Sequence, residues 1–252
     1  WLPDAYQVSP PGFIALFSGI GTKIPLVALA RALPPLMAAA PALRPVMLAV
    51  AAVTMLFGIM AAFRQDDLRR LLGYSSVSQM GYIAMALAAG GAAGYGAAAY
   101  HLVSHGLIKA LLFLAVGEAV LAAGTAKISE LSGRPLPPLI AITFLLASLG
   151  LGGVPPMPAF WSKFQVFTAT AQAGYGWAAG IAVLTSLLTI TTLVQAGARA
   201  FLLKPAGEKA PRVASAPWTL ALLVVAVFAA GLFPGWISGF LSTAAAALAE
   251  GV

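Results

Sequence analysis

Long apolar stretches recur along the entire chain, and only short charged or proline- and glycine-rich loops separate them. Hydrophobic residues make up 61% of the 252 residues, whereas charged residues make up 8%, compared with roughly 25% in an ordinary soluble domain. So few charged side chains cannot cover a core of this size in water, but a bilayer is itself an apolar solvent. The composition therefore excludes a water-soluble fold and predicts an all-α, polytopic transmembrane helix bundle.

The fifth apolar stretch, residues 139–173, is too long for one simple crossing. It contains Gly152, Gly153, Pro155 and Pro156, which favour turns and remove backbone donors. We expect one discontinuous helix here, which indicates a transport path, because broken backbone at membrane depth survives only beside protein or water. A proline kink in a structural helix is the alternative. In all, we place about seven spans, near residues 12–33, 46–63, 75–91, 96–123, 139–173, 177–203 and 217–240.

Lysine and arginine are concentrated in the loops after the second, fourth and sixth segments, and Arg31 and Arg44 lie on the opposite side. By the positive-inside rule, the N-terminus is cytoplasmic and the C-terminus lies outside in a multi-pass protein of the cell membrane. Because the basic residues are scattered among loops, the net charge of +7 does not indicate nucleic acid as a partner. The nine residues in these loops are Arg64, Arg69, Arg70, Lys127, Arg134, Arg199, Lys204, Lys209 and Arg212.

Three lysines, Lys23, Lys109 and Lys163, lie within the apolar segments. A lysine at mid-bilayer costs at least about 2.5 to 3.5 kcal/mol, a large penalty for a residue without a function. Facing water or a carboxylate inside the bundle, a lysine can accept and release protons. The alternative for each lysine is a structural ion pair with an acid.

His101, His105 and Lys109 follow one another at intervals of four residues, so on a helix they share one face and rise about 6 Å at each step. This ladder predicts a proton relay, because imidazole takes up a proton on one nitrogen and releases it from the other. Packed polar residues and a zinc site are the alternatives. Zinc lacks a third ligand here, because Glu118 lies about 20 Å farther along the helix. Glu118 is a candidate relay member or a counter-ion of a lysine.

The chain has no cysteine and only two histidines. The absence of cysteine excludes disulfides, iron–sulfur clusters and thiolate zinc sites. No phosphate loop, dinucleotide fingerprint or nucleophile elbow is present. We therefore expect no metal, no cofactor and no redox chemistry of the chain's own.

Five ordered motifs in the chain resemble those of the antiporter-like membrane subunits of respiratory complex I, of membrane-bound hydrogenases and of Mrp-type Na⁺/H⁺ antiporters. The resemblance covers nearly the whole chain. The motifs are WLPDA at 1–5, GIGTKIPLVALAR at 19–31, DDLRRLLGYSSVSQMGYI at 66–83, HLVSHGLIKALLFL at 101–114 and GGVPPMPAFWSKF at 152–164.

The resemblance implies a 14-helix subunit of two inverted five-helix repeats, each with one broken helix. This chain, which starts at Trp1 without a methionine, would be a fragment covering helices 8–14 as one transmembrane domain, 1–252. Within it, residues 46–203 would form the second repeat, flanked by helices at 12–33 and 217–240. Lys23 matches the lysine that connects two half-channels; His101, His105 and Lys109 match the polar helix 11; Lys163 matches the charged residue of the outlet.

The function implied is proton translocation through a mid-membrane relay of lysine, histidine and water. The chain would be an antiporter-like subunit of a redox-driven NADH-quinone oxidoreductase or a related hydrogenase complex, with other membrane subunits and the bilayer as partners. The D subunit of an Mrp-type Na⁺/H⁺ antiporter is the alternative, and GLFPG at 231–235 favours it. Alternatives of other classes are a non-conducting structural subunit and a metal-binding membrane enzyme that uses His101 and His105.

Overall fold

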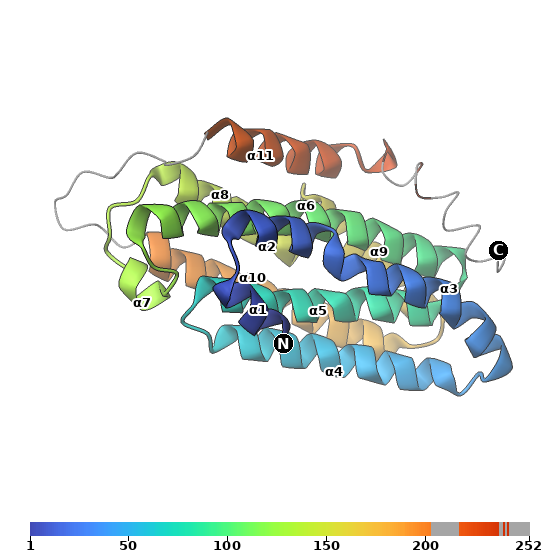
Figure 1. The fold of residues 1–252 in the computed structure, drawn as a ribbon. Coiled ribbons are helices and arrows are strands. Elements are labelled where there is room, and N and C mark those ends of the chain that lie inside the picture. Colours follow the sequence, from blue (N-terminus) through green and yellow to red (C-terminus); the bar gives the residue numbers. More distant parts are fainter. Residues whose placement is uncertain (203–216, 237–238, 240, 242–252) are drawn as a thin grey trace.

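The computed structural model describes residues 1–202, 217–236, 239 and 241, which form a bundle of helices lying roughly along one axis (Figure 1). Within these ranges the chain contains helices and no β-strand. The predicted all-α class is therefore confirmed. The elements are α1 (Leu2–Val8), α2 (Pro11–Gly19), the 3-10 helix η1 (Gly21–Lys23), α3 (Ile24–Ala39), α4 (Leu43–Phe63), α5 (Leu68–Ala89), α6 (Gly91–Ala123), α7 (Ile128–Leu131), α8 (Pro138–Gly152), α9 (Pro158–Gln172), α10 (Gly176–Phe201) and α11 (Pro217–Leu232).

In the described part of the chain, four stretches are long and apolar enough to cross a membrane. They are the α2–α3 stretch Pro11–Ala39, α4, α6 and α10, with hydropathies of 1.8 to 2.4. The helices α8 and α11 are apolar but shorter. Since each of the four reaches at least the roughly 20 residues that a bilayer requires, the structure fits a polytopic membrane bundle, and the number of seven spans stays a prediction.

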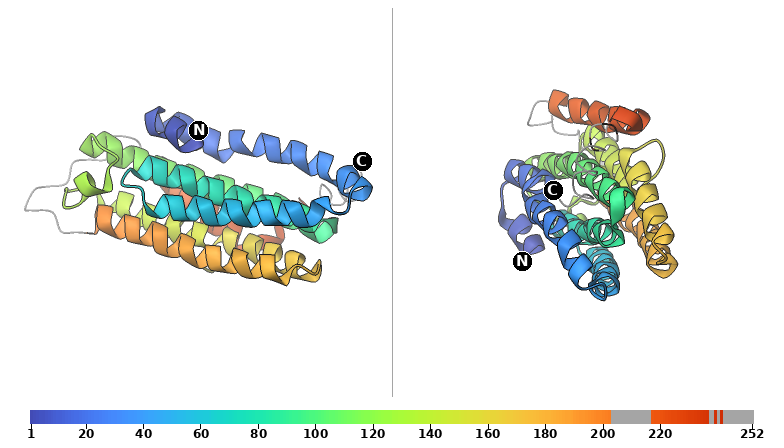
Figure 2. Two further views of the ribbon diagram at one scale, coloured as in Figure 1. Left: turned by 90° about the horizontal axis from the view of Figure 1, so that it is seen from below. Right: turned by 90° about the vertical axis from the view of Figure 1, so that its right-hand side faces the viewer.

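Helix α6 is the centre of the bundle. It packs against α2, α5, α8, α9 and α11. In the end-on view of Figure 2, the green α6 lies between the blue α2–α3 stretch and the yellow α9, while the red α11 lies on the outside. Residues on α6 therefore contact helices from the N-terminal, middle and C-terminal parts of the described chain.

The predicted break in the fifth stretch is confirmed. Helix α8 ends at Gly152, and Gly153 adopts a φ of +89°, a conformation that glycine favours. The bond between Pro155 and Pro156 is cis, and α9 begins at Pro158.

A second interruption lies in the first apolar stretch, where the sequence pattern does not predict one. The stretch 12–33 reads as one continuous span, but α2 ends at Gly19 and α3 begins at Ile24. Pro25, at the start of α3, has no N–H and its ring would clash with the carbonyl of a preceding helical turn. The chain passes this point as a short 3-10 turn that ends at Lys23.

Several other boundaries also differ from the expected ones: α3 ends at Ala39 rather than at residue 33, and α6 begins at Gly91 rather than at residue 96. Helix α5 begins at Leu68 rather than at residue 75, because the Asp67 side chain accepts hydrogen bonds from the backbone N–H groups of Arg69 (2.8 Å) and Arg70 (3.2 Å) and caps the helix. The sequence pattern places these two arginines in a loop, whereas they lie in the first turn of α5. Helix α11 ends at Leu232. Lys204, Lys209 and Arg212 lie outside the described residues.

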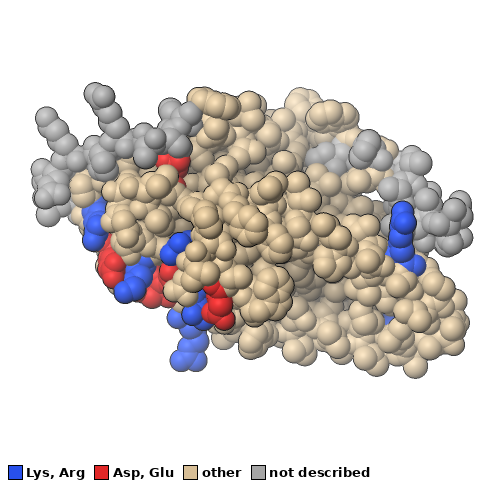
Figure 3. All heavy atoms as spheres, in the orientation of Figure 1, with Lys and Arg blue, Asp and Glu red and all other residues tan. Residues whose placement is uncertain are grey.

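Charged residues gather at one end of the bundle, on the left in Figure 3, around α1, α7 and the start of α5. Two loops pair there through Leu68 N–H to the Ala126 carbonyl (2.9 Å) and Ile128 N–H to the Asp66 carbonyl (2.6 Å). The Ser129 hydroxyl donates to the Asp66 carboxylate at 2.5 Å. These bonds tie the α4–α5 loop to the α6–α8 loop.

The same end carries an exposed ion pair between Lys127 and Glu130, 2.9 Å apart. The Thr125 hydroxyl and the Lys127 ammonium, both hydrogen-bonded to Glu130, hold the pKa of that carboxyl below its usual value. Because the pair is exposed, its contribution to stability is small.

Helices α4 and α5 approach closely through glycines. A Cβ atom on Gly58 would lie 2.5 Å from the Ser78 backbone nitrogen, and one on Gly81 would lie 2.8 Å from the Ala51 carbonyl oxygen. The Ser78 hydroxyl donates to the Met55 carbonyl at 2.9 Å. Small residues and such interhelical hydrogen bonds are typical of membrane helix packing.

We predict that Gly58→Ala destabilises the full-length protein by about 1 to 3 kcal/mol, because the added methyl group overlaps the α5 backbone. Gly180→Ala on α10 is the matched control, since a Cβ there meets nothing within 4 Å. Thermal unfolding in detergent measures both. Equal melting temperatures for the two variants would contradict the close approach of α4 and α5.

We also predict that Asp67→Ala costs about 1 kcal/mol through loss of the α5 cap, and that Asp67→Asn costs less because the amide oxygen still accepts. Amide hydrogen exchange at Arg69 and Arg70 is the measurement. The cap assignment is wrong if Asp67→Ala leaves exchange at both amides unchanged.

Candidate functional site

The five side chains expected to form a relay are all buried. The exposed fraction is 7% for Lys23, 0% for His101, His105 and Lys109, and 1% for Lys163. Burial of ionisable groups is costly unless other polar groups compensate, so their partners define the site.

Lys163 lies in α9 directly beyond the break, and its ammonium donates to the Gly152 carbonyl (3.3 Å) and to the Ser186 hydroxyl (3.1 Å). The Ser186 hydroxyl itself donates to the Gly152 carbonyl at 2.7 Å. A helix that stops leaves its last carbonyls without partners and carries partial negative charge at that end. The break thus creates the acceptor for the buried ammonium.

Tyr82 of α5 lies between Lys163 and the histidines. The Lys163 Nζ is 4.7 Å from the centroid of the Tyr82 ring, a cation–π contact, and the ring centroids of Tyr82 and His101 are 5.5 Å apart. The Tyr82 hydroxyl donates to the Ala182 carbonyl at 2.7 Å, which fixes the ring.

His101 connects three helices. Its Nδ1 is 2.9 Å from the Ser162 hydroxyl of α9, and its Nε2 is 3.2 Å from the Gln79 Oε1 of α5. Ser162 directly precedes Lys163 in α9. His101 therefore bridges α5 and α9 by hydrogen bonds, next to Lys163 of the broken helix.

His105 lies next along α6, with its ring centroid 6.3 Å from that of His101. Neither of its ring nitrogens is hydrogen-bonded to a residue in the described ranges. The cations that act on it electrostatically include Lys23 and Lys109. His101, His105 and Lys109 thus all lie buried on one helix, α6.

Lys109 ends the ladder. Its ammonium donates to the Leu72 carbonyl at 2.7 Å and to the Ser75 hydroxyl at 2.6 Å, both on α5, and lies 5.6 Å from the centroid of the Phe113 ring. The acceptors of this lysine are a carbonyl and a hydroxyl, as they are for Lys163.

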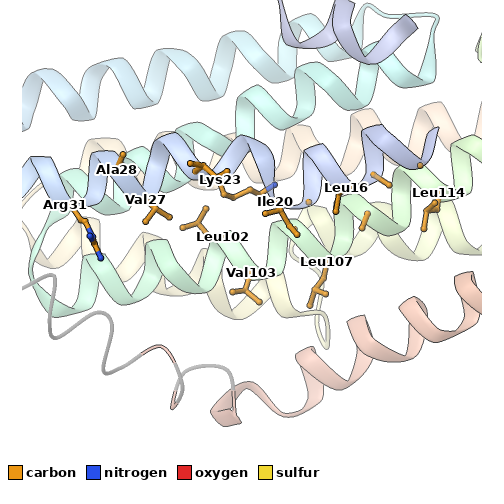
Figure 4. A pocket seen from close by; sticks show the side chains of 16 residues that line it. Leu16, Ile20, Lys23, Val27, Ala28, Arg31, Leu102, Val103, Leu107 and Leu114 are labelled. Atoms are coloured by element: carbon orange, nitrogen blue, oxygen red, sulfur yellow. The ribbon is translucent and has the colours of Figure 1, made fainter. Parts of the chain in front are cut away.

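Lys23 lies at the end of the α2–α3 interruption, where its ammonium donates to the Ser18 carbonyl and to the Thr22 hydroxyl (3.2 Å). A groove of about 990 Å³ runs between the α2–α3 stretch and α6, and its lining is apolar except for Lys23 and Arg31 (Figure 4). Of the five residues expected to form a relay, Lys23 is the one that lines this groove.

Three ion pairs lie at the charged end and join Asp67 to Arg69, Asp4 to Arg70 and Glu130 to Lys127. These three pairs involve none of the buried lysines Lys23, Lys109 and Lys163. Glu118 is 7% exposed and lies nine residues beyond Lys109 on α6. Across the described part of the chain, no three histidine, aspartate or glutamate residues are grouped so as to hold a metal ion.

Five partners of the relay residues were not identified from the sequence. They are polar or aromatic residues on helices of the bundle, and all but Ser186 are buried; a polar residue within an apolar helix is the signal that could have found most of them. They are Ser75, Gln79, Tyr82, Ser162 and Ser186.

Comparison with known proteins gives consistent results. Residues 1–189 match the family model described as "NADH:quinone oxidoreductase/Mrp antiporter, TM". NADH-quinone oxidoreductase subunit N of Desulforudis audaxviator is 34% identical over 92% of this chain and 50% of its own length. The D subunit of a Na⁺/H⁺ antiporter from Alkalihalophilus pseudofirmus is 31% identical over 77% of this chain and 40% of its own length.

A chain of respiratory complex I from Thermus thermophilus superimposes with a TM-score of 0.88 and 29% identity, over 100% of this chain and 54% of that one. The chain spans about half the length of the curated relatives it matches. Since the family model covers most of the sequence, the chain is an integral membrane protein that belongs to the NADH:quinone oxidoreductase/Mrp antiporter transmembrane family.

Proposed function

We propose that the chain conducts protons across the membrane through a relay of Lys23, His101, His105, Lys109 and Lys163. The observation that carries the proposal is the position of His101, which is hydrogen-bonded through Ser162 to the segment that holds Lys163 and is followed by His105 along α6. Imidazole and amine groups exchange protons, and water completes the steps between side chains that do not touch.

The relay groups are held in a way that suits proton exchange. The hydrogen-bond acceptors of Lys109 and Lys163 are neutral carbonyl and hydroxyl oxygens. If a buried lysine were paired with a carboxylate, each release of its proton would leave the carboxylate as an uncompensated buried negative charge. Because the carbonyl and hydroxyl oxygens are uncharged, the lysine can release its proton without leaving a buried negative charge behind.

We propose seven crossings, formed by α2–α3, α4, α5, α6, α8–α9, α10 and α11. The charged end of the bundle, which includes the α4–α5 and α6–α8 loops, would face the cytoplasm, so the N-terminus is inside and the C-terminus outside (Figure 3). In this arrangement the chain corresponds to helices 8–14 of a 14-helix subunit. Residues 46–203 would form its second five-helix repeat, within one domain of 1–252.

Transport against a gradient needs an energy source outside this chain. Moving one charge against 100 mV costs about 2.3 kcal/mol. We propose that the chain is an antiporter-like subunit in a redox-driven complex, where electron transfer in partner subunits supplies this energy. The relationship to the D subunit of a Na⁺/H⁺ antiporter supports a second candidate, in which a sodium gradient supplies it.

We predict that Lys163→Ala lowers proton translocation by the full-length parent complex about tenfold or more, because it removes the proton-carrying group at the helix break. Lys127→Ala is the control, since Lys127 is an exposed lysine at the charged end, and it should transport at the parental rate. A pH-sensitive dye in inverted membrane vesicles reports both rates. Unchanged transport by Lys163→Ala would favour a non-conducting structural subunit.

We predict that an electron donor such as NADH, added to the same vesicles, builds a pH gradient and that Lys163→Ala abolishes it. Sodium added without a donor should leave the pH unchanged. If sodium alone drives the pH change and Lys163→Ala abolishes that response, the chain belongs to an Mrp-type antiporter and the redox-driven assignment is wrong.

A further inference from the structure

We propose that Gln79 is a positioning residue that fixes the protonated nitrogen of His101. Its carbonyl oxygen holds a proton on Nε2, so that Nδ1 is the atom that takes up and releases the transported proton. This inference rests on the proposed relay function and names the residue that directs it.

The geometry places each nitrogen of His101 against a different partner. Nε2 is 3.2 Å from the Gln79 Oε1, and Nδ1 is 2.9 Å from the Ser162 Oγ. A carbonyl oxygen only accepts hydrogen bonds, so Nε2 is the donor and carries the hydrogen. Nδ1 then presents its lone pair to the Ser162 hydroxyl.

Both charge states of the ring fit these partners. In the neutral ring, Nδ1 accepts from the Ser162 hydroxyl. When a proton binds to the Nδ1 lone pair, the new N–H donates to Ser162 Oγ, whose hydrogen turns to the Ala159 carbonyl at 3.3 Å. Release of this proton restores the neutral ring, while the Nε2 proton stays on the side of Gln79 throughout.

Within the described part of the chain, the Gln79 side chain makes no hydrogen bond other than the one to His101. Its side chain is fully buried, and its amide nitrogen is not hydrogen-bonded to a described residue. Its polar contact there is the one to His101. The carbonyl oxygen of this buried glutamine is therefore placed to set the tautomer of the His101 ring.

Ser162 fits either tautomer, because its hydroxyl can donate to Nδ1 or, at 3.3 Å, to the Ala159 carbonyl. The Gln79 carbonyl oxygen fits only the tautomer with hydrogen on Nε2. The titratable side chains that face His101 are Tyr82 from α5, His105 from α6, Lys163 from α9 and Lys23 from η1. The Tyr82 hydroxyl is engaged by the Ala182 carbonyl, and the lysines are donors in their charged form.

The first test needs no substitution in Gln79. Nitrogen NMR of the full-length protein with ¹⁵N-labelled histidine, with the His101 signal assigned by its loss in His101→Gln, reports the tautomer directly. We expect the neutral ring to carry hydrogen on Nε2. A neutral ring with hydrogen on Nδ1 would overturn the inference.

Substitutions then test the role of Gln79. Gln79→Met has similar size but no acceptor, so the Nδ1–H tautomer should appear and transport by the parent complex should fall about tenfold. Gln79→Glu keeps the size and the acceptor but adds a charge that holds the ring as imidazolium, so transport should fall at least as far. Gln65→Met makes the same chemical change at the charged end and should leave tautomer and transport unchanged.

The outcomes separate the two proposals. If His101→Gln abolishes transport but Gln79→Met changes neither tautomer nor rate, the inference about Gln79 is wrong and the relay stands. If His101→Gln transports at the parental rate, His101 is no relay member and the proposed function itself fails at this residue. If Gln79→Met lowers transport while the neutral ring keeps its hydrogen on Nε2, Gln79 has a purely structural role and the inference is wrong.

Discussion

Backbone carbonyl groups that lose their helical partners inside an apolar bundle need hydrogen-bond donors, and this requirement organises the structure. The α8–α9 chain and the α2–α3 chain are both interrupted, and in each a lysine donates to a carbonyl of the preceding helix. Lys163 donates to Gly152, and Lys23 donates to Ser18. The breaks and the buried lysines therefore depend on one another.

Hydrogen bonds to oxygen atoms of neighbouring helices explain how the bundle holds lysine side chains in its interior. The ammonium groups of Lys109 and Lys163 are bound by carbonyl and hydroxyl oxygens contributed by neighbouring helices. Such acceptors stabilise a charge but remain neutral when it leaves. A chain of groups held in this way can change charge state one member at a time, which suits a relay.

Helix α6 joins these sites because it is central and its polar face is continuous. His101 bonds to α5 and α9, and Lys109 bonds to α5, so one helix contacts both halves of the broken-helix region and the neighbouring long helix. A shift of any of these helices would change several hydrogen bonds together. At the charged end, the hydrogen bond between Ser129 and Asp66 joins α7, which follows α6, to the loop that precedes α5.

The amino-acid sequence alone determined the helical class, the break after Gly152 and the ladder from His101 to Lys109, because hydropathy, proline and glycine positions and helical spacing are local properties. Only the tertiary structure brought Gln79 against His101, since these residues lie on different helices and no spacing rule relates them. The interruption before Ile24 was also missed, because the apolar character of that stretch continues through it. Contacts between helices arise from packing, which the one-dimensional pattern does not encode.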